Sequence, residues 1–177
     1  DMDGDTSMLS YPLLDVYDGA VWRSFGAMLE DSSSTLTLAW ALNWDGFQPF
    51  STSNKSCDAI YLVCLNLPRE LRYLRQNMII VGIRPWGSHG PNIHSLFAPL
   101  VDELLLLYHD GIHVHTHASP LEKRHVKCLL LLVACDLPAA KQIGGFSSHS
   151  SARGCHRCTK TFKKPDEKEE EKKEEEE

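Results

Sequence analysis

The run LLLLVACD, which ends at Asp136, constrains the fold of this chain more than any other stretch of its sequence. Consecutive leucines followed by a valine are typical of a strand that is buried on both faces in the middle of a sheet. An ionised carboxylate at the end of such a strand costs several kcal/mol unless it is paired or binds a metal ion. The sequence therefore raises the question of which group Asp136 faces.

Three strand-like segments precede this run. Alternating and apolar residues predict strands over residues 35–50, 57–68 and 77–86. The links between them are short, so we expect the three strands to form an antiparallel meander. The regular part of the first strand is expected to stop at Asp45-Gly46.

A helix and two more strands are predicted next. Leucines at helical spacing predict a helix over residues 92–111, which Gly111 would end. Residues 112–117 alternate as a short strand, and residues 124–136 are expected to form a fully buried strand. Because the helix supplies a crossover, we expect this last strand to lie parallel to the first. A helix or turn is expected over residues 137–146.

The order of three strands, helix, strand and helix predicts an α/β fold with a ribonuclease H-like mixed sheet. In that arrangement the first strand and the strand after the crossover are neighbours, about 4.8 Å apart. Asp45 stands at the end of the first of these strands and Asp136 at the end of the second. We therefore expect the two carboxylates to face each other, with divalent metal between them.

Magnesium or manganese suits such a pair of carboxylates. Two carboxylates this close repel each other, and one stays protonated unless a cation intervenes. Mg²⁺ binds one or two carboxylates together with water and phosphate oxygens, and a two-metal site can activate a water or a 3′-hydroxyl for displacement at phosphorus. Asp45 and Asp136 are thus predicted to be catalytic and Mg²⁺-binding. The alternative is that both are solvated, since Asp-Gly after a strand is commonly only a turn.

Cys155 and Cys158 form a C-x-x-C motif. Two thiolates at this spacing supply half of a tetrahedral Zn²⁺ site, so Zn²⁺ is a second candidate cofactor. His149 and His156 are near, but His156 lies inside the motif and is poorly placed. The alternative is a pair of thiols without metal, and a redox pair is disfavoured because no thioredoxin-like unit surrounds the motif. The other four cysteines lie in strand-like stretches and are expected to be free and buried.

Histidines and arginines give weaker signals. His113, His115 and His117 share one face of a strand because side chains alternate along it. No acidic or cysteine partner stands near them in sequence, so we expect an exposed edge strand rather than a metal site. Four arginines are candidate phosphate contacts, although surface solubility explains them equally well: Arg69, Arg72, Arg75 and Arg84.

The charge of the chain is concentrated at its end. The net charge is -6 over 177 residues, and residues 163–177 contribute -4 of it through five Lys against nine Asp or Glu. The remaining residues 1–162 are nearly neutral, so they lack the basic character of a domain that binds nucleic acid with its whole surface. A protein that never touches nucleic acid is therefore a further alternative. The tail is expected to be disordered or a single exposed helix.

Four parts follow from these patterns. They are a loop-rich and helical lead-in over residues 1–34, a partial ribonuclease H-like core over 35–146, a C-x-x-C knuckle over 147–162 and the charged tail over 163–177. Apolar runs fall far short of the roughly 18 residues that span a bilayer, and no secretory leader is visible. We therefore expect a soluble, intracellular protein without a membrane partner.

Several of these blocks resemble the transposases of CACTA-type (En/Spm-like) DNA transposons. The resemblance extends over roughly residues 15–162, and the blocks stand in the family's order. They are DVYDGAVW, LNWDGFQPF, IYLVCLNLPRELRY, NMIIVGIRP, LFAPLVDELLLLY and ACDLPAAKQIGGFSSHSSARGCHRC.

The resemblance implies a catalytic domain of the DDE type that cuts and rejoins transposon-end DNA with Mg²⁺. It also implies a location in the nucleus and a homo-oligomer for the full-length protein. Asp45 matches the first family aspartate and Asp136 the second. Cys155 and Cys158 match a C-x-x-C between the second and third acids, and in related recombinases a later pair of histidines completes that zinc site.

Two departures from the family's pattern shape the functional prediction. A third acid should lie well downstream of the C-x-x-C, and neither that acid nor the histidine pair is found here. We therefore expect a C-terminally truncated catalytic fragment that is inactive alone. The alternative is a non-catalytic, transposon-derived DNA-binding or interaction module. A third possibility, an unrelated α/β domain, requires Asp45 and Asp136 to lie far apart.

Overall fold

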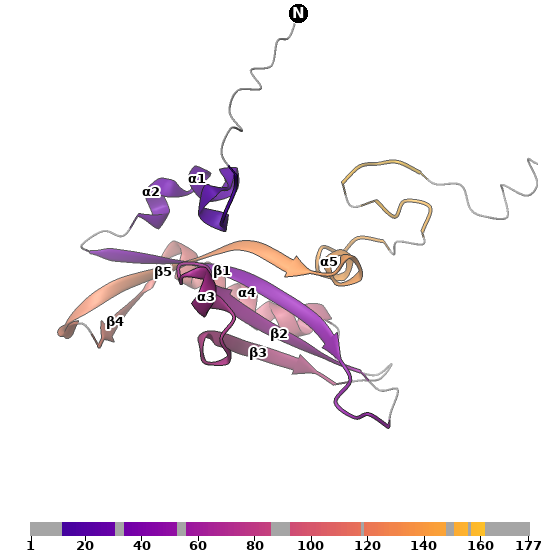
Figure 1. Cartoon of the computed structure of the whole chain (residues 1–177), viewed down its shortest axis with the longest axis horizontal. Coiled ribbons are helices and arrows are strands. Elements are labelled where there is room, and N and C mark those ends of the chain that lie inside the picture. The colour runs from indigo at the N-terminus through magenta and orange to yellow at the C-terminus, as the bar shows by residue number, and fades with distance from the viewer. Residues whose placement is uncertain are drawn as a thin grey trace, which may run out of the picture.

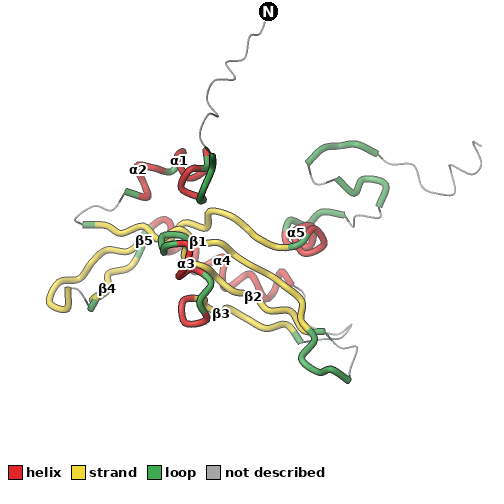
Figure 2. Tube along the Cα trace, in the orientation of Figure 1, coloured by secondary structure: helices red, strands yellow, loops and turns green. Residues whose placement is uncertain are grey.

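A five-stranded mixed sheet with helices on both faces forms the body of the molecule (Figures 1 and 2). The computed structural model describes residues 12–30, 34–52, 56–85, 93–117, 119–147, 151–155 and 157–161. The tail 163–177 and the histidines at 149 and 156 lie outside the described residues. The predicted α/β class is confirmed.

The strands follow the order β3-β2-β1-β5-β4 across the sheet. Their bounds are Thr35–Phe47 for β1, Cys57–Cys64 for β2, Met78–Arg84 for β3, Ile112–Thr116 for β4 and Ser119–Cys135 for β5. The first three strands form the predicted antiparallel meander. β5 pairs in parallel with β1, and β4 pairs antiparallel with the outer side of β5. The prediction that residues 112–117 form an edge strand is confirmed.

Helix α4 makes the crossover between the two halves of the sheet, as predicted. It runs over Ile93–His109, and Gly111 with φ of 72° follows it in the left-handed region that favours glycine. The other helices are short. They are η2 (Val16–Asp18), α1 (Ala20–Ser24), α2 (Gly26–Leu29), α3 (Arg69–Arg72), η3 (Arg75–Asn77) and α5 (Leu137–Ile143). No helix of the described residues combines the length and the apolar character that crossing a bilayer needs.

The core has two layers, one on each face of the sheet, because side chains alternate along the strands. On one face Leu42 and Trp44 of β1 pack with β2 against α4, where Trp44 meets the ring of Phe97 edge-on at 6.3 Å between centroids. On the opposite face Ala39 and Ala41 pack with residues of η2, α1 and α2. Small alanines on this face leave room for the short N-terminal helices to lie close to the sheet.

The prediction that residues 124–136 are fully buried is wrong. Leu130 is 37% exposed and Val133 is 43% exposed. β4 pairs with β5 only as far as Val126, so among the described residues no strand covers the outer edge of β5 over residues 127–135. The first strand also runs one residue past the predicted stop at Asp45-Gly46, to Phe47.

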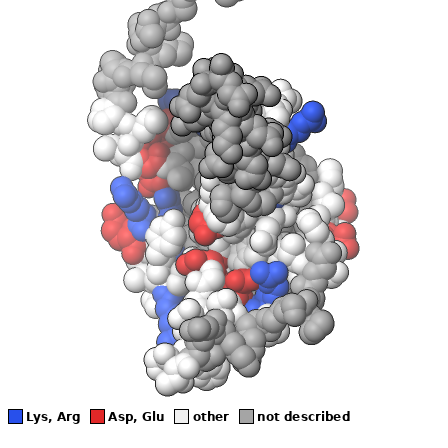
Figure 3. Space-filling view, turned by 90° about the vertical axis from the view of Figure 1, so that its right-hand side faces the viewer, with Lys and Arg blue, Asp and Glu red and all other residues white. Residues whose placement is uncertain are grey.

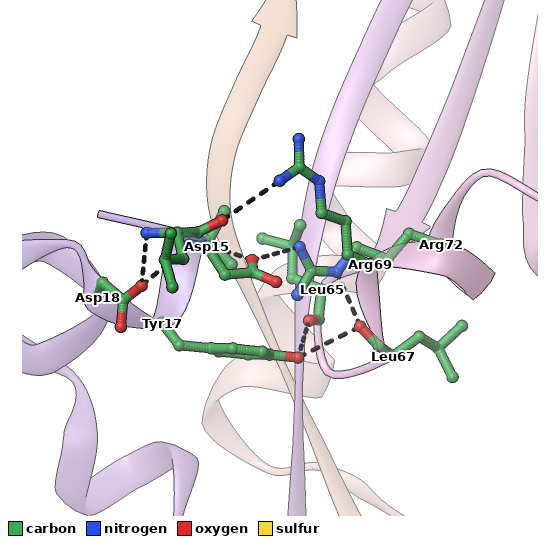
Figure 4. A network of polar contacts seen from close by, with 9 residues as sticks. Asp15, Tyr17, Asp18, Leu65, Leu67, Arg69 and Arg72 are labelled. Carbon is green, nitrogen blue, oxygen red and sulfur yellow. Dashed lines mark hydrogen bonds and ion pairs between the residues drawn. The ribbon is translucent and has the colours of Figure 1, made fainter. Parts of the chain in front are cut away.

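A polar clamp ties the N-terminal segment to the turn after β2 (Figure 4). The guanidinium of Arg72, only 4% exposed, donates to the carboxylate of Asp15 at 2.6 Å and to the carbonyl oxygen of Leu67 at 2.8 Å. It also lies over the ring of Tyr17, 4.9 Å from the centroid. The Tyr17 hydroxyl donates to the carbonyl oxygen of Leu65 at 2.7 Å. Arg72, a candidate phosphate contact, is therefore a structural residue.

Replacing Asp15 by asparagine should destabilise the fold, because it leaves the buried Arg72 guanidinium without its counter-ion. We expect D15N to lower the free energy of unfolding by on the order of 2 kcal/mol in chemical denaturation. R69Q is the control, since the hydrogen bond that Arg69 donates to the carbonyl oxygen of Leu14 is long, at 3.3 Å, and exposed, and its change should stay within about 0.5 kcal/mol. Equal losses in the two variants would contradict the clamp.

The difference in stability between the wild type and D15N should depend on pH in a defined direction. The hydrogen bond from Arg72 lowers the pKa of Asp15 below its usual value. The contribution of Asp15 is therefore complete above the unfolded pKa of about 3.9, and it is lost as pH falls through the lower folded value. The difference in unfolding free energy between wild type and D15N should shrink from pH 7 towards pH 3. A difference that does not change with pH would argue against the ion pair.

Candidate functional site

Parallel pairing of β1 with β5 brings the two predicted aspartates to the same edge of the sheet. Trp44 is the register partner of Cys135; Asp45 is the next residue on β1, and Asp136 directly follows the last residue of β5. Paired residues on neighbouring strands lie about 5 Å apart. The two aspartates each follow a member of such a pair, so their backbones are close together. The third sequence-based possibility, two distant aspartates on an unrelated domain, does not agree with this register.

Both aspartates line one pocket at this edge, with a volume of about 180 Å³. β1 and β2 contribute the strand ends, β3 contributes an arginine, and the first turn of α5 closes the other side. The lining residues are Trp44, Asp45, Gly46, Asp58, Arg84, Asp136, Pro138, Ala139 and Gln142. The pocket is therefore formed by the four elements that meet at the carboxyl ends of β1 and β5.

Asp136 has a structural role in addition to its place in the pocket. It is the N-cap of α5, and its Oδ1 atom accepts a hydrogen bond from the amide of Ala139 at 2.8 Å. Pro138 stands in the first turn of this helix, where a missing N–H costs nothing. Such a cap stabilises a helix by about 1 kcal/mol. One carboxylate oxygen is thus committed to the helix, and the other remains for a ligand.

The carboxylate of Asp45 makes no hydrogen bond or ion pair with any of the described residues. The charge of Asp45 nevertheless affects a neighbouring side chain on β2. Burial and, after it, the charge of Asp45 raise the pKa of the Tyr61 hydroxyl above its usual value. Tyr61 lies on β2 opposite Asn43, two residues before Asp45 on β1. Asp45 is therefore the carboxylate of the pocket with both oxygens available.

The sequence reasoning missed Asp58, which is the third carboxylate of the pocket. Its Oδ2 atom accepts a hydrogen bond at 2.6 Å from Nε of Arg84, which also lies over the Trp44 ring at 5.3 Å. Asp58 pairs with Gly46 across the antiparallel hairpin. The start of a second strand faces the end of the first in any meander, so position 58 opposite Asp45-Gly46 was the available signal. Arg84 is thus fixed beside the pocket.

Two of these carboxylates suit a divalent cation. Mg²⁺ takes one or two protein carboxylates and completes its shell with water and phosphate oxygens, and the free oxygens of Asp45 and Asp136 meet that need. Within the described ranges, no group of three or more His, Cys, Asp or Glu is arranged to hold a metal ion. The oxygens of Asp45 and Asp136 therefore suit a cation that keeps several water ligands. They do not by themselves form a complete coordination shell.

The C-x-x-C motif lies after α5 and is linked to it. The ammonium of Lys141, buried on α5, donates to the carbonyl oxygen of Gly154, next to Cys155. The amide of Arg157 donates to Cys155 Sγ at 3.4 Å. This hydrogen bond, followed by one from Cys158, lowers the pKa of the Cys155 thiol. The two sulfur atoms are therefore close enough to interact, as half a zinc site requires.

The thiols should differ in reactivity at neutral pH. A lowered pKa gives Cys155 more of the reactive thiolate, whereas burial raises the pKa of the Cys64 and Cys128 thiols. In the chain treated with a chelator at pH 7, iodoacetamide should modify Cys155 well before Cys64 or Cys128, as followed by mass spectrometry of peptides.

C158S is the matched variant for this experiment, because it removes the thiol that interacts with Cys155. It should slow the modification of Cys155 and leave the rates of the two buried thiols unchanged. Adding Zn²⁺ should protect Cys155 in the wild type. Modification of Cys128 as fast as Cys155 in the native chain would contradict the assigned environment.

Charges are mixed on the end of the molecule where β1 ends. Figure 3 shows acidic and basic side chains intermingled on this face, without a surface of a single sign. This pattern agrees with the nearly neutral charge of residues 1–162. Of the four arginines considered for phosphate contacts, Arg84 lines the pocket, and Arg69 lies at the N-terminal clamp.

A comparison with protein families identifies the chain. Residues 7–173 match the model of the transposase family tnp2. A search of curated proteins found no match. The matched range includes β1, β5, the C-x-x-C motif and the pocket lined by Asp45, Asp58 and Asp136, which we call the acidic pocket. With nearly its whole length matched, the chain belongs to the tnp2 transposase family.

Proposed function

We propose that this chain carries the first part of the catalytic domain of a CACTA-type, cut-and-paste DNA transposase. The domain would be of the DDE type with a ribonuclease H-like sheet, would act on transposon-end DNA in the nucleus, and would work as a homo-oligomer in the full-length protein. The observation that carries the proposal is the register that places Asp45 and Asp136 one residue beyond the paired Trp44 and Cys135. Membership of the tnp2 family supports it.

Asp45 and Asp136 are the residues proposed to hold Mg²⁺ or Mn²⁺. When bound, such an ion supplies Lewis-acid stabilisation of the oxygens that attack and leave phosphorus. Asp136 would present its Oδ2 atom, because Oδ1 is occupied by the amide of Ala139. Arg84, fixed by Asp58 and Trp44, would place a positive charge beside the phosphate.

A zinc ion is proposed for the thiols of Cys155 and Cys158, with further ligands from outside the described residues. The contact of Lys141 with Gly154 would keep this half site at a fixed position relative to α5. Helix α5, which Asp136 caps, would then connect the two metal positions. A rigid connection of this kind suits a site whose geometry must be maintained during reaction.

One observation favours the second candidate, a non-catalytic DNA-binding or interaction module derived from a transposon. The capping bond of Asp136 explains an aspartate at this position without any metal. The two candidates differ in the role of its charge: a cap needs only an acceptor oxygen, whereas a cation needs the carboxylate. Asparagine at position 136 keeps the cap and loses the charge.

Binding of Mn²⁺ tests the proposal directly. In ¹H–¹⁵N spectra of the wild type, low Mn²⁺ concentrations should broaden the amide signals around Asp45 and Asp136. D45N and D136N should each lose this local broadening while their thermal stability stays near that of the wild type. D102N, which changes an exposed carboxylate on α4, is the control and should behave as the wild type.

The residue-resolved signal separates the pocket from the acidic tail, which also attracts cations. Broadening confined to residues after 163 would overturn the metal site and favour the non-catalytic module. Broadening at the pocket that survives in D136N would show that the Asp136 charge is not needed.

We expect the chain alone to be inactive on DNA. Among the residues that the structure describes, Asp58 is the only further carboxylate lining this pocket, and its Oδ2 atom is held by Arg84, so we propose that the third acid comes from elsewhere. Incubation with transposon-end DNA and Mg²⁺ or Mn²⁺ should yield no specific nicks on a sequencing gel. Specific, metal-dependent nicking that disappears in D136A would contradict this expectation.

A further inference from the structure

A second polar pocket lies at the opposite end of β1 from the aspartates. It has a volume of about 580 Å³ and is formed by the start of β1 and by the β4–β5 hairpin. We call it the hairpin cleft. Its lining residues are Ser34, Thr35, His113, Glu122, Lys123, Arg124 and His125. Among these described lining residues, four side chains can carry positive charge and one, that of Glu122, is a carboxylate.

Strand pairing sets these side chains in a regular array. His113 pairs with His125 and His115 pairs with Lys123 across the antiparallel β4–β5 hairpin. Directly opposed residues point to the same face, with Cβ atoms about 5 Å apart. Two imidazoles of one strand therefore stand beside an imidazole and an ammonium of the next, on the exposed edge of the sheet.

His125 is held in place by its neighbours. Its Nε2 atom lies 2.7 Å from the carbonyl oxygen of Asp110, so this nitrogen must carry the hydrogen and donate it. Its Nδ1 atom lies 3.2 Å from the hydroxyl of Thr35. Both ring nitrogens are engaged, so the neutral ring has no lone pair left for a metal ion. This arrangement excludes a metal site made of His113 and His125.

His113 and Lys123 remain as the available donors. The ring of His113 stacks on the fixed ring of His125, with centroids 4.8 Å apart and planes inclined by 27°. The nitrogens of His113 and the ammonium of Lys123 make no hydrogen bond or ion pair with the described residues. N–H and ammonium donors around an open polar space are the groups that contact phosphate oxygens.

We propose that the hairpin cleft binds a backbone phosphate of duplex DNA, at a site separate from the acidic pocket. The inference rests on the proposed function in taking DNA as the partner and in placing one phosphate at the acidic pocket. From Thr35 to Asp45 a strand spans roughly 33 Å, which is about one helical turn of DNA. A duplex that reaches both ends of β1, with one phosphate at the acidic pocket, would bring another phosphate to the cleft. The contact would orient the duplex without reading its sequence.

The salt dependence of DNA binding tests this contact. Affinity of the full chain for a 20-bp duplex would be measured by fluorescence anisotropy at several salt concentrations. Each phosphate contact contributes about 0.9 to the slope of log K against log salt concentration. K123Q should reduce the slope by about that amount, and H113Q should weaken binding as well. R23Q removes a charge from α1, outside the residues that line the cleft, and should leave the slope unchanged.

Chemical shift changes in the amides of the hairpin locate the contact. Duplex DNA should shift signals of residues 113 and 122–125 in the wild type and shift them less in K123Q. Equal slope changes in K123Q and R23Q would overturn the proposal, because they indicate diffuse attraction. Shifts with inorganic phosphate but none with duplex would overturn it too, since the cleft would then accept only a free anion.

Failure of the cleft contact can be distinguished from failure of the proposed function. If DNA shifts only signals around Asp45 and Asp136, the cleft is not a contact while the acidic pocket still is. If Mn²⁺ fails to bind but K123Q lowers the salt slope, the cleft is a DNA contact on a module without a metal site. A cationic edge that served only to prevent strand pairing would leave DNA binding unchanged in every variant.

Discussion

Everything at the acidic end of this molecule depends on the parallel pairing of β1 with β5. Antiparallel neighbours can be joined by a tight turn, but a parallel pair needs a crossover, and α4 supplies it. The crossover helix packs its apolar side on Trp44 and its neighbours in β1 and β2. The core contact that fixes the helix therefore also fixes the strand ends that carry Asp45 and Asp136. Packing and candidate chemistry share the same residues.

Much of this arrangement could be predicted from sequence because its signals are local. The alternation of apolar residues predicted the meander, and the spacing of leucines predicted α4. Gly111 indicated where that helix ends. The parallel partnership of β1 and β5 followed from the helix between them. The ribonuclease H-like topology and the metal site stay predictions, although the register agrees with the proximity of the aspartates that they require.

What sequence could not provide were properties that depend on neighbours across the sheet. The burial of β5 was overestimated because β4 pairs with only its first half. Arg72 resembles a surface cation in the sequence and is buried because Asp15, fifty-seven residues earlier, meets it. Asp58 escaped notice because its partner Arg84 lies on another strand. The spacing of residues along one strand predicts on which face of the sheet a side chain lies. The pairing of that strand with others determines which neighbours the side chain contacts.

The long separation between β1 and β5 also has a consequence for how the chain folds. Thr35 and His125 meet in the sheet although they are 90 residues apart in sequence. The meander can form from local contacts, whereas β5 must wait until a large loop has closed, and such non-local pairings form slowly. During that interval the apolar strand is open to pairing with other chains. The outer edge of residues 127–135 keeps part of that exposure after folding, so the segment that completes the acidic pocket is also the one most in need of protection during synthesis.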